Sequence, residues 1–360
     1  MALALLRGEN LRLFARFELR PAARLNLIVG ANAAGKTTLL EAIFVLSRAR
    51  SFRATRASEL AGGEGSHWSV FAELAAGEWS HRIGVGLREQ SLETRLDQHE
   101  RVGAAELARA LPVQLIEPAA HRLLDDGPAY RRSYVDWGVF HVEQSFIGLW
   151  RRYQRALKQR NRALRLNLTK PAVMAWDTEL SESGEAITQL RLRHVEQTRP
   201  HFQRLAAQLL DDTVPTLRLQ PGWNTDMPLL VALREQRESH QRAGTTLQGP
   251  HRAELKISLA DRKAQQRLSR GQQKLLIAAM VMAQARTLID RGSKAPVLLI
   301  DDFESELSQA YQARWAEVLA LYPGQVFVTA FEPPQALQAL RPAMFHVEQG
   351  VLRHATDCDE

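Results

Sequence analysis

The first 120 residues have the hydrophobic pattern of a mixed α/β segment. Apolar and polar residues alternate from residue 11 to residue 19, which predicts a half-buried strand. Residues 25–29 are almost all apolar and predict a buried strand, and the apolar spacing from residue 38 predicts a helix that opens there. Residues 68–74 and 79–87 alternate like the two strands of a hairpin, and the glycine-rich residues 62–66 predict a turn before them.

Residues 121–244 have helical spacing instead. Residues 144–176 predict one helix, which we expect Pro171 to end, because proline disrupts a helix interior. Residues 185–210 predict a second helix, the antiparallel partner of the first. Neither helix is long enough, or regular enough in heptads, for an extended coiled coil.

From residue 245 onward the α/β pattern returns. It predicts strands at residues 255–259, 297–300 and 325–329 and an apolar helix at residues 272–288. The chain therefore divides into residues 1–120, a helical segment over 121–244, and residues 245–360.

A phosphate-binding loop lies between the strand at 25–29 and the helix that follows it. Residues 30–37 fit the pattern of a glycine, four free positions and Gly-Lys-Thr. Backbone N–H groups at a helix N-terminus attract phosphate oxygens. Lys36 is expected to reach the β- and γ-phosphates, and the Thr37 hydroxyl is expected to hold Mg²⁺.

Two more motifs follow in the last third of the chain. The strand at 297–300 runs into Asp301, a candidate Mg²⁺ ligand, and Asp302, a candidate for orienting the attacking water. About thirty residues earlier, Ser269 and Gly271 open the helix at 272–288 and offer a hydroxyl and backbone donors to an anion. Because the phosphate loop needs carboxylates from a neighbouring strand, residues 1–120 and 245–360 are expected to form one domain interrupted by residues 121–244.

One face of the helix predicted over residues 144–176 is strongly basic. This stretch contains no acidic residue, and five cations recur on one stripe at spacings of four and three residues. Like charges at such spacing destabilise a helix unless they meet a partner. The stripe is therefore either a solvated surface or a set of contacts to DNA phosphates, and we favour the second interpretation. Its members are Arg151, Arg155, Lys158, Arg162 and Arg165.

Amino-acid composition indicates where the protein is found more clearly than what it does. The hydrophobic share of 45% supplies a core, and the formal net charge of +7 favours polyanionic partners. The single cysteine, Cys358, excludes an intrachain disulfide. Charged residues follow the N-terminus too soon for a signal peptide, and the longest apolar run, residues 275–283, is about half a membrane span. A soluble, cytoplasmic protein is expected.

The motifs together resemble the RecF family of DNA gap-repair ATPases, which is related to the heads of Rad50 and SMC proteins. The segment Ser269–Gln272 looks like the signature motif of ATP-binding-cassette (ABC) ATPases. The resemblance covers most of the chain, and the stretches Gly127–Arg132 and Gly249–Arg252 are its most specific parts. The other stretches that carry it are Gly30–Ile43, Ser51–Arg53, Asp136, Ser269–Leu275, Asp301–Asp302 and Ser305–Leu307.

The resemblance implies an α/β fold, that of a P-loop ABC-type ATPase head with an inserted helical subdomain. It implies that ATP, with Mg²⁺, drives dimerisation, with Lys36 and Thr37 of one protomer facing Ser269 and Gly271 of the other. It also implies that the dimer clamps DNA at single-strand gap junctions, with RecR and RecO as partners and RecA loaded downstream. The residues expected to bind ATP are Gly30, Ala31, Asn32, Ala33, Ala34, Gly35, Lys36, Thr37, Thr38, Ser269, Gly271 and Gln272.

Three other functions fit only part of the pattern. A nucleotide-binding subunit of a membrane transporter would have far fewer residues between Lys36 and Asp301. An SMC- or Rad50-like chromosome-structuring head would carry long heptad arrays. A small-molecule kinase would explain the phosphate loop but not the signature motif.

The chain departs from the family pattern at several positions. Ala33 stands where glycine is usual, and a methyl group there disfavours positive φ. Ser308 stands where an aspartate is expected, which puts dimer contacts from that loop in question. Asp302 replaces the longer glutamate of many cassette ATPases, and Val328–Ala330 stands where those proteins carry a histidine. We therefore expect slow ATP turnover.

Overall fold

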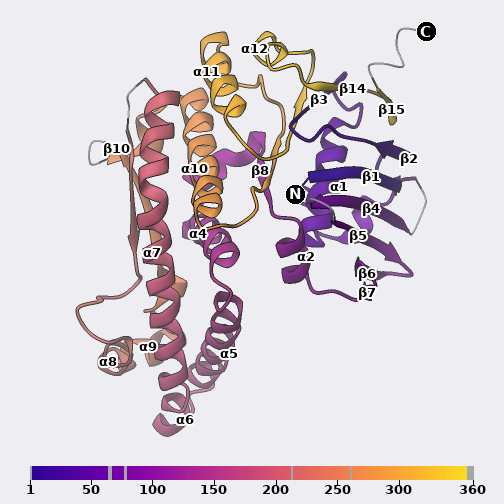
Figure 1. Cartoon of the computed structure of the whole chain (residues 1–360). Coiled ribbons are helices and arrows are strands. Elements are labelled where there is room, and N and C mark those ends of the chain that lie inside the picture. The colour runs from indigo at the N-terminus through magenta and orange to yellow at the C-terminus, as the bar shows by residue number, and fades with distance from the viewer. Residues whose placement is uncertain (1, 64–66, 77–78, 212–213, 260–261, 355–360) are drawn as a thin grey trace. The chain divides into compact units, whose positions relative to one another are not determined.

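The computed structural model describes residues 2–63, 67–76, 79–211, 214–259 and 262–354 (Figure 1). The chain forms two compact units. The first comprises Met1–Ala120, Arg270–Val281 and Lys294–Glu360, and the second comprises His121–Ser269 and Met282–Ser293. Part of the turn predicted at residues 62–66, and Cys358, lie outside the described residues.

A six-stranded, mostly parallel sheet in the first unit carries the two strands that precede the motifs. Its order is β15-β14-β3-β13-β12-β8, and β15 runs antiparallel to its neighbour. Strands β3, β12 and β13 are buried at every position, which explains their continuous apolar sequences. The strands are β3 (Leu25–Val29), β8 (Val113–Ile116), β12 (Val297–Ile300), β13 (Val326–Ala330), β14 (Ala343–Glu348) and β15 (Val351–His354).

An antiparallel sheet in the same unit has the order β2-β1-β4-β5-β6-β7. Strands β4 and β5 form the predicted hairpin, so that prediction is confirmed. The strand predicted over residues 11–19 is wrong at its start, because β1 ends at Leu11 and Arg12 adopts a φ of 54°, which begins a turn into β2. The strands are β1 (Ala2–Leu11), β2 (Phe14–Leu19), β4 (Trp68–Ala76), β5 (Trp79–Arg88), β6 (Ser91–Leu96) and β7 (His99–Glu100).

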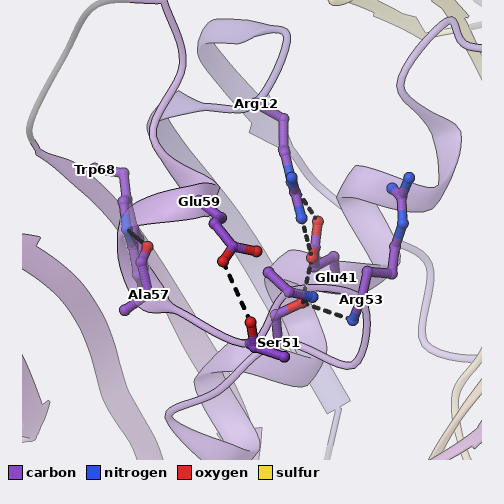
Figure 2. A network of polar contacts seen from close by, with 9 residues as sticks. Arg12, Glu41, Ser51, Arg53, Ala57, Glu59 and Trp68 are labelled. Atoms are coloured by element: carbon purple, nitrogen blue, oxygen red, sulfur yellow. Dashed lines mark hydrogen bonds and ion pairs between the residues drawn. The ribbon is translucent and has the colours of Figure 1, made fainter.

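Helix α1 (Lys36–Arg48) shares one hydrophobic core with residues of both sheets. A buried carboxylate on this helix, Glu41, ties two other segments to it (Figure 2). The Arg12 guanidinium donates to both Glu41 oxygens, at 2.9 and 3.1 Å, and the Ser51 hydroxyl donates to the same group. Ser51 in turn accepts a hydrogen bond from the backbone N–H of Arg53 at 2.8 Å. The turn after β1 and the segment after α1 are therefore both held against the helix that begins at the phosphate loop.

The first unit is completed by shorter helices: α2 (Ala104–Ala110), α11 (Gln309–Ala320) and α12 (Gln335–Gln338). Helix α10 (Arg270–Asp290) gives residues 270–281 to the first unit and its remaining residues to the second. Among the described residues, no helix is both long and apolar enough to cross a membrane.

The second unit is mainly helical and is organised around α5 and α7, which lie side by side (Figure 1). They are antiparallel, because Arg160 near the end of α5 meets Asp177 at the start of α7, and Trp150 lies beside Arg191. The antiparallel pairing predicted from the sequence is confirmed. The helices are α3 (Arg122–Asp125), α4 (Pro128–Val142), α5 (Phe146–Arg165), α6 (Lys170–Met174), α7 (Asp177–Leu209), α8 (Leu229–Glu235) and α9 (Arg237–Ala243).

The prediction that Pro171 ends the first long helix is wrong. Helix α5 ends at Arg165, and Pro171 lies in the first turn of α6. Proline suits that position because the first N–H groups of a helix need no intrahelical partner. Leu168 accordingly lies beyond the end of α5 and is exposed.

A three-stranded antiparallel sheet of order β11-β10-β9 also belongs to the second unit. Strand β10 (Glu254–Leu259) pairs along its length with β9 (Thr216–Gln220) and at its end with β11 (Arg262–Lys263). This pairing keeps residues 245–269 in the helical unit, beyond the boundary expected at residue 244.

Candidate nucleotide-binding site

The loop after β3 depends on two glycines. Gly30 has a φ of 154°, and a Cβ added there would lie 2.2 Å from the Val347 carbonyl oxygen. Gly35 has a φ of 118°, and its added Cβ would lie 2.7 Å from the Phe14 ring. Any side chain at either position would need the surrounding backbone or core to move. The sequence spacing of these glycines therefore matches two places where the chain passes close to its neighbours.

Ala33 adopts the left-handed conformation that its family position usually gives to glycine. Its φ is 62°, and its side chain is exposed. For an L-residue this conformation costs roughly 1–2 kcal/mol. The sequence predicted that a methyl group at this position would disfavour a positive φ. Ala33 does have a positive φ, so its backbone is strained. Ala31 and Asn32 are also exposed, whereas Ala34 is buried.

The first turn of α1 places Lys36 and Thr37 at the end of the loop. The Lys36 ammonium donates to the carbonyl oxygens of Gly30 at 2.7 Å and Ala31 at 2.9 Å. Burial lowers the pKa of Lys36, and the negative charges of Asp302 and Asp301 act in the opposite direction. Thr38 is buried and donates its backbone N–H to the Gly35 carbonyl at 2.9 Å, which fixes the loop to the helix.

Parallel pairing brings Asp301 to Thr37. Strands β3 and β12 both flank β13 and run parallel to it, so the residues that follow them emerge at the same edge of the sheet. The Thr37 hydroxyl lies 3.0 and 3.1 Å from the two Asp301 carboxylate oxygens. The structure thus joins two residues that are far apart in the sequence and that were both expected to bind Mg²⁺.

Thr329 at the end of β13 holds the acidic pair from the other side. Its hydroxyl donates to an Asp301 carboxylate oxygen at 2.7 Å and accepts the backbone N–H of Asp302 at 2.8 Å. Asp302 itself has a φ of 57°. A non-glycine residue in this conformation persists only where neighbours fix it, and such residues cluster at functional sites.

These groups suit Mg²⁺ bound together with a phosphate. Mg²⁺ prefers oxygen ligands and is usually held in proteins by one or two carboxylates plus substrate phosphates and water. Asp301 and Thr37 supply a carboxylate and a hydroxyl in contact with each other. Among the described residues there is no cluster of three or more His, Cys, Asp or Glu side chains able to hold a metal alone. The carboxylate and hydroxyl therefore fit a metal that binds together with a nucleotide.

The segment that resembles the signature motif lies at the start of α10. Ser269 is exposed and precedes the helix, Gly271 is buried in its first turn, and Gln272 is partly buried. A Cβ added to Gly271 would lie 2.5 Å from the Glu306 carbonyl oxygen, so glycine allows α10 to contact the loop after β12. The expected contact of this segment with the nucleotide of a second protomer stays a prediction.

The basic residues of the second unit divide into paired and exposed groups. Arg160 is fully buried and forms an ion pair with Asp177 at 2.7 Å, and Arg152 pairs with Glu179 at 2.6 Å. The five residues of the basic stripe are all exposed and lie on the face of α5 opposite its buried side chains. Within the described ranges none of the five side chains forms a hydrogen bond or ion pair, although the hydrogen bond from Arg152 and, in addition, the charge of Arg155 lower the pKa of Glu179. We call this face, formed by Arg151, Arg155, Lys158, Arg162 and Arg165, the α5 basic face.

The other family-specific stretches form structural contacts. Arg131 donates to both oxygens of Glu254, at 2.7 and 3.0 Å, and Arg132 donates to the Ala253 carbonyl at 2.9 Å. His251 hydrogen-bonds the Tyr153 hydroxyl at 2.6 Å. Burial lowers the pKa of His251 to about 4, so this ring is neutral at physiological pH. These contacts support a structural role for both arginines and for the histidine.

Sequence patterns do not single out two residues that lie near the acidic pair. Thr329 belongs to the run that replaces a histidine, and Lys274 lies near the end of the signature stretch. Thr329 could have been found from the sequence, because it is a polar residue near the carboxyl end of β13, a buried strand beside β12. No sequence pattern could have indicated the role of Lys274, because its partners are backbone carbonyls about thirty residues away.

Comparison with known proteins agrees with this geometry. The family described as the RecF/RecN/SMC N-terminal domain matches residues 2–353. The DNA replication and repair protein RecF of Stenotrophomonas maltophilia is 40% identical over 348 residues, which are 94% of this chain and 96% of that protein. RecF of Pseudomonas aeruginosa is 38% identical over 346 residues, or 94% of each chain.

Solved structures show the same fold. The structure of the recombination mediator RecF with ATP, from the RecFOR pathway, superposes with a TM-score of 0.86 at 21% identity and covers 98% of this chain and 97% of that one. An Smc head domain from Pyrococcus furiosus superposes with a TM-score of 0.61 at 16% identity, over 98% of this chain and 95% of that one. The α/β fold is that of an ABC-type ATPase head, as the resemblance to the RecF family implied. With relatives this similar over nearly the full length of both proteins, the chain belongs to the RecF family of DNA replication and repair proteins.

Proposed function

We propose that the chain is an ATP-dependent DNA-binding protein of recombinational repair and replication-fork maintenance. The observation that carries the proposal is the contact of Thr37 with Asp301 at 3.0 Å, which joins the phosphate loop to the acidic strand end in a chain of the RecF family. ATP, with Mg²⁺ held by Thr37 and Asp301, binds at the loop. Lys36 reaches the β- and γ-phosphates.

ATP binding drives formation of a homodimer in this proposal. The start of α10, with Ser269, Gly271 and Gln272, meets the nucleotide held by the partner protomer. The exposure of Ser269 at the start of α10 supports this, because a helix N-terminus offers backbone donors to a phosphate. One nucleotide is then enclosed by two chains, which links occupancy of the site to assembly.

The dimer clamps DNA at single-strand gap junctions. The first unit hydrolyses ATP, and the helical unit contributes DNA phosphate contacts through the α5 basic face. RecR and RecO are the proposed partners, and RecA is the recombinase loaded downstream. The basic net charge and the five exposed cations support a polyanionic ligand.

In this proposal ATP hydrolysis is slow and is stimulated by DNA. Hydrolysis releases the clamp from the DNA. Asp302 has a shorter side chain than the glutamate of many cassette ATPases, and Thr329 occupies the end of the adjacent strand. A threonine hydroxyl cannot serve as a general base at neutral pH. Thr329 therefore cannot assist proton transfer during hydrolysis as a histidine could. This combination supports a switch that stays assembled for long periods.

The test compares the wild type with Lys36→Met. Sedimentation velocity and binding to gapped DNA are measured with and without ATP and Mg²⁺. We expect ATP to dimerise the wild type and to tighten its DNA binding, and to do neither for Lys36→Met. Lys294→Met is the matched control, because Lys294 is exposed in the same unit. A wild type whose assembly and DNA affinity ignore ATP contradicts the proposal.

A further inference from the structure

Lys274 is a buried lysine whose ammonium group contacts the loop after β12. It lies in the second turn of α10, within the part of the helix that belongs to the first unit. Its Nζ donates to the carbonyl oxygens of Asp302 at 2.6 Å, Ser305 at 2.9 Å and Phe303 at 3.4 Å. The loop therefore turns three of its carbonyl groups toward one cation. We call residues 302–307 the acidic-pair loop.

The acidic-pair loop has a conformation that needs such a contact. Asp302 and Glu306 both have positive φ values, of 57° and 64°. Each non-glycine residue in this region costs of order 1–3 kcal/mol and persists where the surrounding structure over-determines it. Converging carbonyl dipoles also repel one another unless a cation lies between them. Lys274 satisfies both requirements from a single position.

Buried aromatic rings lie near the Lys274 ammonium. Its Nζ lies 6.0 Å from the centre of the Trp315 ring, which stacks on Phe303 at 4.9 Å. Both rings are fully buried. Lys274 is therefore held in a buried environment, with its ammonium against the loop carbonyls.

Asp302 connects this arrangement to the phosphate loop. Its negative charge acts on Lys36 as well as on Lys274, so it lies within electrostatic range of both cations. Its own backbone N–H is held by Thr329 and its carbonyl by Lys274. The direction of the Asp302 side chain is therefore set by contacts to its main chain on both sides.

The same turns of α10 begin at the segment expected to meet a second nucleotide. Gly271, three residues before Lys274, packs against the Glu306 carbonyl. A helix transmits a shift of its first turn to its second as a nearly rigid body, because its backbone hydrogen bonds span four residues. Any movement at the start of α10 reaches the acidic-pair loop through Gly271 and Lys274 together.

We propose that Lys274 is a positioning residue for ATP hydrolysis, which holds Asp302 in its working direction and couples it to the start of α10. The proposal rests on the proposed ATPase function. Burial lowers the pKa of Lys274 to about 8, with the charges of Asp302, Glu306 and Asp301 acting in the opposite direction, so the ammonium form prevails at neutral pH. Lys274 does not itself contact the reacting atoms in this proposal.

The experiment separates hydrolysis from binding in the full-length protein. Lys274→Met, Lys274→Arg and the control Lys294→Met are compared for affinity toward a fluorescent ATP analogue, for ATP-dependent dimerisation and for single-turnover hydrolysis on gapped DNA. For Lys274→Met we expect ATP affinity and dimerisation within about threefold of wild type, and hydrolysis slowed about tenfold to 100-fold, since small misplacement of a catalytic group has effects of that size. Lys274→Arg, which keeps the cation, should recover part of the rate.

The outcomes distinguish the two proposals. Hydrolysis by Lys274→Met at the rate of Lys294→Met overturns the role of Lys274, and so does a parallel loss of ATP affinity and hydrolysis. A wild type that neither binds the analogue nor dimerises contradicts the proposed function instead. If the thermal unfolding midpoint shows that Lys274→Met does not fold, Lys274→Gln, which retains an N–H donor for the carbonyls, is measured against the same criteria.

Discussion

Helices α1 and α5 carry their positive groups in two different arrangements. Nine of the 13 residues of α1 are buried, and the polar groups expected to bind nucleotide lie at its N-terminus. Helix α5 buries one face and exposes the other along its length, with five cations on the exposed face. The candidate binding groups lie at the N-terminus of α1, whereas those of α5 lie along one side of the helix.

Each arrangement suits a different kind of ligand. At the N-terminus of α1, Thr37 and Lys36 both have partners at hydrogen-bonding distance, and the backbone donors of a helix start favour a single bound phosphate. Along α5 the cations are spaced by one helical turn, which suits a repeating polyanion. A convergent site is sensitive to single substitutions, whereas a distributed surface should respond gradually.

The largest expected effect concerns the buried side of α5. Arg160→Ala removes one partner of a fully buried ion pair and leaves Asp177 uncompensated, which should destabilise the helical unit by about 3–5 kcal/mol. Urea unfolding followed by circular dichroism measures the shift in midpoint. Arg152→Ala, which breaks an exposed pair on the same helix, is the control and should leave the midpoint close to that of the wild type. Equal midpoints for both variants would show that burial of the pair is unimportant.

The next effect tests the convergent site. Asp301→Asn keeps the shape of the side chain but removes the charge beside Thr37, so single-turnover ATP hydrolysis should fall about 100-fold or more. The loss should not be restored by raising the Mg²⁺ concentration to ordinary assay levels. Glu9→Gln, an exposed carboxylate of the same unit, serves as control and should hydrolyse normally. Hydrolysis by Asp301→Asn at the control rate contradicts the assignment of Asp301.

A smaller, graded effect is expected on the α5 basic face. The double variant Arg155→Gln/Arg162→Gln should weaken binding to gapped DNA and reduce the slope of log affinity against log salt by about one for each phosphate that is no longer neutralised. Affinity for ATP should not change. Arg16→Gln/Arg82→Gln removes the same charge from exposed positions of the first unit and should have the weaker effect. An identical salt slope for the two double variants argues that α5 does not touch DNA.

The smallest effect concerns Ala33. Because Ala33 has a φ of 62°, Ala33→Gly should relieve strain and raise stability by about 0.5–1 kcal/mol. Ala31→Gly is the matched control, since Ala31 is exposed in the same loop without a positive φ and glycine there only adds unfolded-state entropy. Thermal unfolding should move the two variants in opposite directions. A lower midpoint for Ala33→Gly would show that the loop is not strained at this residue.

Much of the fold and of the candidate site follows from local sequence. The buried strands β3, β12 and β13 were predictable because a strand covered on both faces must be apolar throughout. The approach of Asp301 to Thr37 was predictable in outline, because ligands of a phosphate loop must come from a neighbouring parallel strand. Contiguous motifs with a fixed chemical purpose can thus be recognised from sequence alone.

Other features depend on contacts that no local pattern contains. The alternation of residues 11–19 continues across a turn, so it could not show where β1 ends. The pairing of β10 with β9 joins segments separated by the helices α8 and α9 and decides which unit residues 245–269 enter. Lys274 recognises backbone carbonyls, which every residue has, and its partners are therefore invisible in a sequence.

The closing contacts of the phosphate loop bear on how the protein is made. Gly30 packs against the carbonyl of Val347, and the Gly350 N–H donates to the Ala34 carbonyl at 3.0 Å. These partners leave the ribosome about 300 residues after the loop itself, which at roughly 5–20 residues per second is a delay of tens of seconds. During that time the helical unit can form, but the phosphate loop lacks the strand that shapes it. A nascent chain is therefore expected to complete its phosphate loop late, after the α5 basic face is already folded.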